Sequence, residues 1–397
     1  MRHDLSFVWD ERLRAYDFGP DHPMSPIRVF LAHKLICDWE LLDLPYVDVV
    51  GPVEPASEVD LLRVHRRSFV EAVQRASLEG AEPDLARGLG TEDVPIFIGM
   101  HDAAALVAGA TLAAARAVHS GATRHAINLT GGLHHSMPGA AAGFCIYNDI
   151  AVAIAWLLDQ GVSRIAYVDV DVHHGDGVQA IFYDDPRVMT VSLHEDPQTL
   201  FPGTGYPDEI GGPSALGTAV NVALPAGTTD IGWLRAFDAV VPQVLEAFQP
   251  EILFTQHGCD THADDPLAHL SLSIEGQLAS YQRLHSLAHQ LCGGQWIAVG
   301  GGGYECVDVV PRAWTHLTAV AAESPIDTQA PVPTEFTEFL QSHLGRPGPL
   351  RMGDGVTPHP QPWGSDYDML DPVDRCVLTT RDAVFPSLGL VADPLAF

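Results

Sequence analysis

Short apolar runs recur along the middle of the chain and are separated by longer segments of helical length. The runs are rich in β-branched residues and bounded by glycine or polar residues, which is typical of strands buried on both faces. They span residues 125–129, 164–172, 188–193, 251–255 and 295–299. Amphipathic or alanine-rich segments of helical length span residues 101–119, 149–159, 233–248 and 274–291. Strands that alternate with helices predict βαβ units, and therefore an α/β fold whose parallel sheet is covered on both faces.

Four of these runs lead directly into glycines and polar side chains. The segments are GGLHH at 131–135, HHGDG at 173–177, HGCD at 257–260 and GGGGY at 300–304. Open parallel sheets place their active sites at the carboxyl ends of the strands, so four such segments are expected to meet at one edge. One of them alone would be unremarkable, but four together predict a functional site.

The run 164–172 carries acidic residues in a regular alternation. Because side chains of a strand alternate between faces, Asp169, Asp171 and His173 are expected on one face and the intervening valines on the other. Two carboxylates and an imidazole on an apolar strand are costly unless metals or hydrogen bonds satisfy them. Oxygen and nitrogen ligands of this kind suit Zn²⁺ or Fe²⁺. A buried polar network without metal is the alternative.

The composition narrows the class of protein. Of the 397 residues, 46% are apolar and 18% are charged, which fits a globular chain of one large or two ordinary domains. The net charge is −30 and Lys34 is the only lysine. Such a surface repels phosphate backbones, so nucleic-acid binding is not expected. It weakly favours a cationic ligand or a basic patch on a partner.

No targeting or membrane segment is expected. Residues 1–11 contain acids and no apolar core, unlike a signal peptide. No run reaches the roughly 20 apolar residues of a membrane span; residues 103–118 come nearest and include Arg116. The six cysteines form no CxxC pair and are expected to be reduced thiols. These features predict a cytoplasmic protein.

Prolines become frequent from about residue 323. They interrupt helical patterns, and residues 345–364 are expected to be irregular. The interpretation is a catalytic domain over residues 1–322 and a Pro-rich extension over 323–397 that packs on it.

Five separated motifs, in order, resemble the histone deacetylase family. They are GGLHH at 131–135, GFC at 143–145, YVDVDVHHGDG at 167–177, FPGTG at 201–205 and GGGGY at 300–304. With HPM at 22–24 and Arg28, the resemblance covers roughly residues 5–322, and QHGCDTH at 256–262 is similar to the bacterial acetoin-utilisation-type deacetylases. It implies the arginase–deacetylase fold, a single three-layer α/β domain with an eight-stranded parallel sheet.

The resemblance also assigns catalytic roles. Asp171, His173 and Asp260 would bind the catalytic metal, expected to be Zn²⁺ with Fe²⁺ as the other candidate. His134 and His135 would transfer protons, and Asp169 and Asp176 would hold their rings. Tyr304 would donate a hydrogen bond to the oxyanion.

Further residues match the family's substrate and ion sites. Phe144 and Phe201 would wall a tunnel for the lysine stem, with Gly143 on its wall and Leu267 near its mouth. Asp93 would grip the substrate backbone at the rim. A structural K⁺ would be bound by Asp169, Asp171, His173, Ser192 and Leu193.

The implied activity is hydrolysis of the acetamide of N-acetyl-lysine on proteins, with acetyl-CoA synthetase as one candidate substrate. Residues 136–140 lack the lysines common in the histone enzymes, so histones are disfavoured. An acetylpolyamine deacetylase is the alternative, although Leu267 lies where those enzymes tend to carry an acid. An arginase-like ureohydrolase would need acids where Val172, His174 and Gly175 stand, and a non-catalytic module would be expected to lack part of the site.

Overall fold

A single parallel sheet forms the centre of the protein. The computed structural model describes residues 4–360, 362–364 and 367–392. Its eight strands lie in the order β2-β1-β3-β8-β7-β4-β5-β6, and each pair of neighbours is parallel. The strands are β1 (Leu5–Val8), β2 (Val47–Val50), β3 (His125–Asn128), β4 (Ile165–Asp169), β5 (Val188–Glu195), β6 (Ala219–Leu224), β7 (Ile252–Gln256) and β8 (Trp296–Val299). The expected eight-stranded α/β fold is confirmed.

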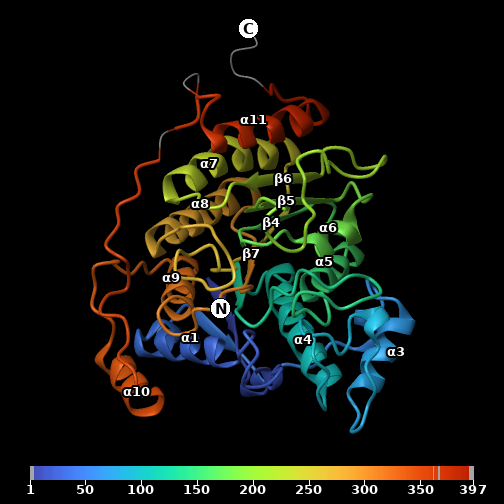
Figure 1. Cartoon of the computed structure of the whole chain (residues 1–397), viewed down its shortest axis with the longest axis vertical. Helices are drawn as coiled ribbons and strands as arrows, with labels where there is room; N and C mark the ends of the chain where they lie inside the picture. Colours follow the sequence, from blue (N-terminus) through green and yellow to red (C-terminus); the bar gives the residue numbers. More distant parts are fainter. Residues whose placement is uncertain (1–3, 361, 365–366, 393–397) are drawn as a thin grey trace.

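Helices cover both faces of this sheet (Figure 1). One apolar core lies between the sheet and α1, α7, α8 and α9, and a second lies between the sheet and α3, α4, α5 and α6. The helices of the described residues, apart from short 3₁₀ turns, are α1 (Ile27–Asp38), α2 (Glu58–Leu61), α3 (Arg67–Ala76), α4 (Met100–His119), α5 (Asp149–Asp159), α6 (Asp176–Phe182), α7 (Asp230–Phe248), α8 (Ile274–Cys292), α9 (Val310–Ala321), α10 (Thr334–Leu344) and α11 (Pro372–Val384).

Apolar patterning located the central strands and long helices but missed others. β3, β5, β7 and β8, together with α4, α5, α7 and α8, begin and end within a few residues of their predicted bounds. The predicted strand 164–172 is too long, because β4 ends at Asp169. The strands β1, β2 and β6 were not predicted, since Ser6, Asp48 and Asn221 interrupt their apolar runs.

The strand order brings the four glycine-containing segments together. The segments follow β3, β8, β7 and β4, which are consecutive neighbours in the sheet. All four strands are parallel, so their carboxyl ends lie at the same edge. The convergence expected from the sequence is therefore a direct consequence of the topology.

The C-terminal part wraps around this domain. α10 contacts α1, and α11 lies against α7 and β6. The Arg235 guanidinium on α7 donates to both carboxylate oxygens of Asp374 on α11, at 2.7 and 3.0 Å, which fixes that contact. Two helices therefore form between the prolines of the segment 323–397. Its separation from the catalytic domain at residue 322 stays a prediction.

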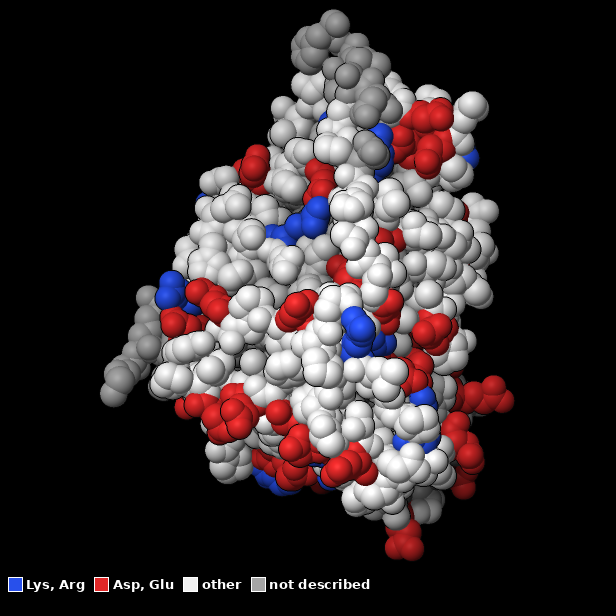
Figure 2. Space-filling view, turned by 90° about the vertical axis from the view of Figure 1, so that its left-hand side faces the viewer, with Lys and Arg blue, Asp and Glu red and all other residues white. Residues whose placement is uncertain are grey.

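The surface reflects the strongly negative net charge. Figure 2 shows one face, where acidic side chains gather mainly in the lower part and basic ones stand at isolated places, often beside acids. None of the helices in the described part of the chain has the length and apolar content that a membrane span needs.

Candidate active site

Asp171, His173 and Asp260 converge at the carboxyl edge of the sheet. The first two follow β4, and Asp260 follows β7. His173 Nδ1 lies 3.0 Å from Asp171 Oδ1 and 3.1 Å from Asp260 Oδ2. One potential ligand atom from each residue lies within 4.8 Å of the others, and all three residues are buried. The residues expected to bind metal therefore form a compact group.

Local turns, and not a continuous strand, orient the first two of these residues. Residues 170–173 lie beyond the end of β4. The Asp171 N–H donates to Asp169 Oδ1 at 3.1 Å, and the His173 N–H donates to Asp171 Oδ1 at 3.0 Å. These bonds between residues two apart hold the functional side chains in place. The strand argument found the right residues, but the structure holds them by turns.

Glycines allow the neighbouring loops to approach the carboxylates. A Cβ at Gly258 would collide with the Asp171 carboxylate, and a Cβ at Gly302 would collide with that of Asp260. The Gly302 N–H donates to Asp171 Oδ2 at 2.8 Å, and Gln256 Nε2 donates to the same oxygen at 2.7 Å. The absence of side chains at Gly258 and Gly302 thus leaves room for the two carboxylates, and the Gly302 N–H supplies one hydrogen bond to Asp171.

The donor set fits a divalent cation. Asp171 and Asp260 are both fully buried, and Gln256 and the N–H groups that bond to them are neutral. Burial and the negative charge of Asp171 raise the pKa of Asp260. A bound divalent cation would relieve this repulsion, and two carboxylates with one imidazole suit Zn²⁺ or Fe²⁺. Three protein ligands leave coordination positions for water and substrate.

His134 and His135 form a pair beside this group, each with its own carboxylate. Their Nε2 atoms are 3.0 Å apart. His134 Nδ1 lies 2.7 Å from Asp169 Oδ2, and His135 Nδ1 lies 2.7 Å from Asp176 Oδ1. Each carboxylate fixes the proton on Nδ1, and the two Nε2 atoms face each other.

The two histidines have opposite acid–base character. Burial lowers the pKa of His134, but the negative charges of Asp169 and Asp171 outweigh it and raise the pKa to about 9. Burial and the positive charge of His134 lower the pKa of His135 to about 4. Neighbouring groups whose pKa values are driven apart are typical of paired proton-transfer residues.

The glycine-rich segment 300–303 carries Tyr304. The Tyr304 N–H donates to Asp265 Oδ2 at 2.7 Å, and Arg28 Nη1 donates to the carbonyl of Gly301 at 2.7 Å. Burial, with the charge of Asp260, raises the pKa of Tyr304 well above its usual range, so the phenol stays protonated and able to donate a hydrogen bond.

The comparisons with known proteins agree with this geometry. Residues 22–321 match the family model described as "Histone deacetylase domain". The chain belongs to the histone deacetylase family. It is 41% identical to the acetoin utilization protein AcuC of Bacillus subtilis (strain 168), over 98% of this chain and 97% of that protein. It is 36% identical to the AcuC protein of Staphylococcus aureus (strain MSSA476), over 81% of this chain and 83% of that protein, and 35% identical to that of Staphylococcus xylosus, over 82% and 84%.

Membership of the family supports a deacetylase activity, and hence a hydrolase. The family is generally metal-dependent, and the group of Asp171, His173 and Asp260 provides a candidate metal site.

The aromatic residues expected around the lysine stem of a deacetylase substrate lie next to the histidines and Tyr304. The Phe201 ring is edge-on to His135, with centroids 4.9 Å apart, and Phe144 is edge-on to Tyr304 at 5.7 Å. Gly143 lies between His135 and Phe201, because a Cβ there would collide with both rings. Phe144 has a positive φ of 66°, which is rare for a bulky residue. Such backbone strain often marks functional sites.

Asp93 and Leu267 are the other residues expected to contact a substrate. Asp93 is exposed and close to His22, whose ring is 4.6 Å from that of Phe144. Leu267 is half-buried, and its N–H donates to Asp265 Oδ1 at 3.0 Å, so it belongs to the same loop as the Tyr304 contact.

The residues expected to bind K⁺ lie on β4 and β5 and in the turns after β4, and they share Asp171 and His173 with the candidate metal site. Asp169 pairs with Ser192 across β4 and β5, and Leu193 follows on β5. Asp171 and His173 continue from Asp169 through the turns described above. The structure brings these residues together, while K⁺ binding stays a prediction.

Several supporting residues received no role from the sequence. Gln256 and Asp265 hold Asp171 and the Tyr304 loop, and Tyr167 donates from its hydroxyl to Asp169 Oδ2 at 2.6 Å. Asp149 accepts from the N–H groups of Gly132 and Leu133, which fixes the turn before His134. The alternation on β4 placed Tyr167 on the face of Asp169 and was a usable signal. Asp149 and Asp265 are isolated acids in the sequence and gave none.

Proposed function

We propose that the chain removes acetyl groups from N-acetyl-lysine side chains of proteins, with Zn²⁺ held by Asp171, His173 and Asp260. The observation that carries this proposal is the histidine pair, His134 and His135, each bonded to a carboxylate and placed beside a group suited to a divalent cation. Hydrolysis of an amide needs an activated water and a proton donor for the leaving amine, and this arrangement provides for both.

The metal supplies the electrophilic part of the chemistry. When bound, Zn²⁺ would polarise the acetyl carbonyl and lower the pKa of water towards about 7. Fe²⁺ suits the same donor set. A structural K⁺ at Asp169, Asp171, His173, Ser192 and Leu193 would balance the negative charge beneath the site.

The histidine pair moves the protons. A neutral Nε2 directed towards the site accepts a proton from the attacking water, and a protonated Nε2 donates one to the departing lysine amine. The lowered pKa of His135 leaves its ring neutral before the reaction, so His135, whose ring is 5.8 Å from that of His173, accepts the proton of the attacking water and then returns it to the lysine amine as the final acid in this proposal. Asp169 and Asp176 act through the rings, by holding each Nδ1 proton.

Tyr304 stabilises the charge that develops on the carbonyl oxygen. A protonated phenol donates a hydrogen bond to that oxygen, and such a bond gains strength as the negative charge grows. The contacts of its loop with Asp265 and Arg28 hold Tyr304 before substrate binds.

The substrate side of the site suits a long apolar stem. Phe144 and Phe201 would enclose the four methylenes of lysine, with Gly143 giving them room and Leu267 near the entrance. Asp93, exposed beside His22, would accept hydrogen bonds from the substrate backbone. An acetylated protein is therefore the proposed partner. Zinc-loaded chain should release acetate from an acetyl-lysine peptide.

An acetylpolyamine is the second candidate, because the net charge of −30 favours a cationic substrate. Leu267 near the entrance argues against it, since it offers no charge to an ammonium group. The kcat/KM for an acetyl-lysine peptide should exceed that for N-acetylspermidine by about tenfold or more, the effect of one lost ion pair in a desolvated site. An equal or higher value for the polyamine would overturn the choice of protein lysine.

The similarity to acetoin utilization proteins motivates one specific substrate, acetylated acetyl-CoA synthetase. The chain should restore activity to the acetylated, inactive synthetase, and the Tyr304→Phe variant should restore much less. No restoration by the wild-type chain, together with full turnover of a peptide, would exclude this substrate and leave the deacetylase activity standing.

A further inference from the structure

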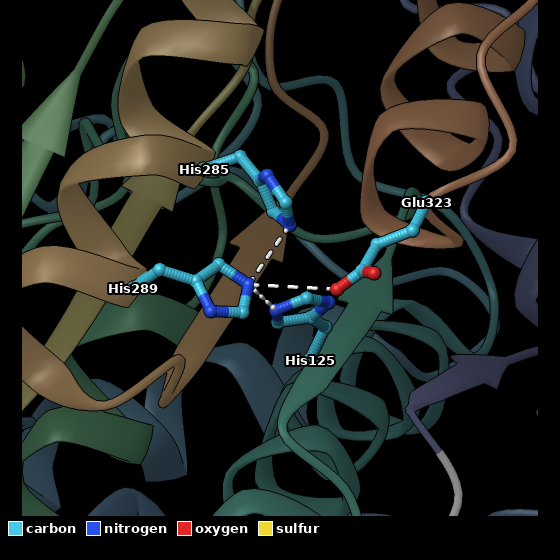
Figure 3. A group of neighbouring side chains, drawn as sticks. All are labelled: His125, His285, His289 and Glu323. Atoms are coloured by element: carbon cyan, nitrogen blue, oxygen red, sulfur yellow. Dashed lines mark hydrogen bonds and ion pairs between the residues drawn. The ribbon is translucent and has the colours of Figure 1, made fainter.

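A second group of histidines lies at the amino edge of the sheet, opposite the catalytic edge. His125 is the first residue of β3, whose other end leads to His134 and His135. His285 and His289 lie on α8, and Glu323 follows the end of α9. Figure 3 shows the three rings and the carboxylate directed towards one another from these three elements.

The local structure of each element places these side chains. His285 and His289 are four residues apart on a helix and so lie on one face, one turn apart. Glu323 has a positive φ of 51°, a conformation that few residues other than glycine adopt. The Glu323 N–H donates to the carbonyl of Val320 at 3.0 Å, which ends α9 and turns the carboxylate towards α8.

The distances suit a tetrahedral cation. His289 Nε2 lies 3.1 Å from His125 Nε2, 3.1 Å from His285 Nε2 and 3.6 Å from Glu323 Oε1. One ligand atom from each of the four residues lies within 4.8 Å of the others. Ligands at the zinc–nitrogen distance of about 2.0–2.1 Å in a tetrahedron are roughly 3.3 Å apart. The three distances from His289 are close to this spacing, and the other pairs of ligand atoms lie within 4.8 Å of each other.

The rings of this group meet through imidazole nitrogens that face one another. His125 Nδ1 lies 2.8 Å from the carbonyl of Ala321 and therefore carries the proton, which leaves a lone pair on Nε2. His289 Nε2 has a single proton or a single lone pair, yet it meets two imidazole nitrogens at 3.1 Å. A cation at the centre would accept a lone pair from every ring. The bond from His125 to Ala321 is also the kind of outer contact that fixes metal-binding histidines.

One side of this histidine group packs against a buried tryptophan, and the other side is accessible to solvent. Trp296, fully buried on β8, lies edge-on or tilted against both His125 and His285, with centroids 5.6 Å apart in each case. His285 and His289 are half-buried and Glu323 is exposed, so an ion can enter from outside.

We propose that His125, His285, His289 and Glu323 bind a structural Zn²⁺. Four protein ligands close the coordination shell, as in structural zinc sites, and leave no position for a substrate. The ion joins the start of β3 to α8 and to the end of α9. It is separate from the metal held by Asp171, His173 and Asp260.

Metal counting tests this assignment. After equilibrium dialysis of the full chain against excess ZnCl₂, mass spectrometry of metals should find two Zn²⁺ per wild-type chain. His285→Ala and His289→Ala should each reduce the count to one while deacetylase kcat stays within about twofold, because neither residue belongs to the catalytic group. Asp260→Ala should also reduce the count to one, and combining it with His289→Ala should leave none. His359→Ala, at an exposed histidine, is the control and should keep two.

Thermal unfolding and the isosteric variant Glu323→Gln separate loss of metal binding from loss of folding. In the Asp260→Ala background, which isolates the second site, Zn²⁺ at a hundred times its Kd should raise Tm by about 3–6 °C. Glu323→Gln should reduce that rise and weaken Zn²⁺ binding by at least about tenfold. Two Zn²⁺ in the His289→Ala chain, one in both the wild type and the His289→Ala chain at saturation, or a Tm of the Asp260→Ala chain that does not respond to Zn²⁺ would each overturn the proposal.

Discussion

Histidines and carboxylates lie close together at both edges of the sheet, but their numbers and the burial of their side chains differ. The catalytic edge has two fully buried carboxylates and one histidine, with His134 and His135 beside them. The opposite edge has three histidines and one exposed glutamate, with no separate proton-transfer pair among the four residues. A catalytic metal needs an open coordination position and groups that move protons, whereas a structural metal needs a closed shell. This difference is why we propose a catalytic metal at one edge and a structural metal at the other.

Removing a carboxylate from the catalytic edge should have the largest effect. Asp260→Ala deletes one of three ligands, so the site should lose its metal and activity should fall by more than about a thousandfold, as expected when the electrophile is lost. Metal analysis and acetate release measure both. Asp264→Ala, at an exposed neighbour, should change neither. If the Asp260→Ala chain still bound one metal ion at the catalytic site, the assignment of Asp260 as a ligand would be contradicted.

Tyr304→Phe should keep the metal and reduce kcat by roughly 10²–10³, the usual effect of removing one oxyanion donor. The phenol contributes only when charge develops, so KM should change little. Steady-state kinetics on an acetyl-lysine peptide measure this. Tyr46→Phe, on the approach to β2, is the matched control. Full turnover by Tyr304→Phe would remove the oxyanion role.

Asp176→Asn should be milder, because Asp176 acts through the His135 ring. Its Oδ1 is 2.7 Å from His135 Nδ1 and fixes which nitrogen carries the proton. Activity should fall by about 10–100-fold with metal content unchanged, as for other outer contacts of a catalytic histidine. Loss of metal in this variant would show that Asp176 supports the metal and not the proton transfer.

Asp354 supports the catalytic edge from the C-terminal segment. Its carboxylate lies 2.9 Å from His262 Nε2 and accepts from the Ile274 N–H at 2.8 Å, close to the Asp260 loop. Burial raises the pKa of Asp354, but these bonds and Arg312 outweigh it and hold the pKa well below 3.8. A carboxyl group whose pKa is lower in the folded than in the unfolded chain stabilises the fold at pH values above its unfolded-state pKa. That stabilisation is lost as the pH falls from the unfolded-state pKa towards the folded-state pKa.

Asp354→Asn should therefore reduce the free energy of unfolding by about 1–2 kcal/mol at pH 7, because the hydrogen bonds to the partly exposed negative charge are lost. The deficit should shrink as pH is lowered below about 4. Urea denaturation at several pH values measures it. A deficit that is the same at pH 3 and pH 7 would mean that the charge of Asp354 does not stabilise this loop.

The sequence revealed the parts of the site that are encoded locally. His134, His135, Asp171 and His173 lie in short motifs after apolar runs, and the parallel-sheet rule places Asp260 at the same edge. Residues that support the site from elsewhere in the chain, such as Asp149 and Asp265, have no local pattern.

The same reasoning explains the missed parts of the fold. Ser6 in β1 and Asp48 in β2 leave no continuous apolar run, and these strands are fixed by the pairing of β1 with both β2 and β3. In the histidine group at the amino edge, only the spacing of His285 and His289 is visible in the sequence. His125 and Glu323 join them through the tertiary fold.

The most direct test of the central claim is zinc reconstitution of deacetylase activity in a chain that retains only the catalytic group. Metal-free His289→Ala protein would be titrated with Zn²⁺ while acetate release from an acetyl-lysine peptide is measured. Activity should rise linearly and reach its plateau at one Zn²⁺ per chain. Full activity in the metal-free protein, or no activity at any amount of Zn²⁺, would contradict a zinc-dependent deacetylase built on Asp171, His173 and Asp260.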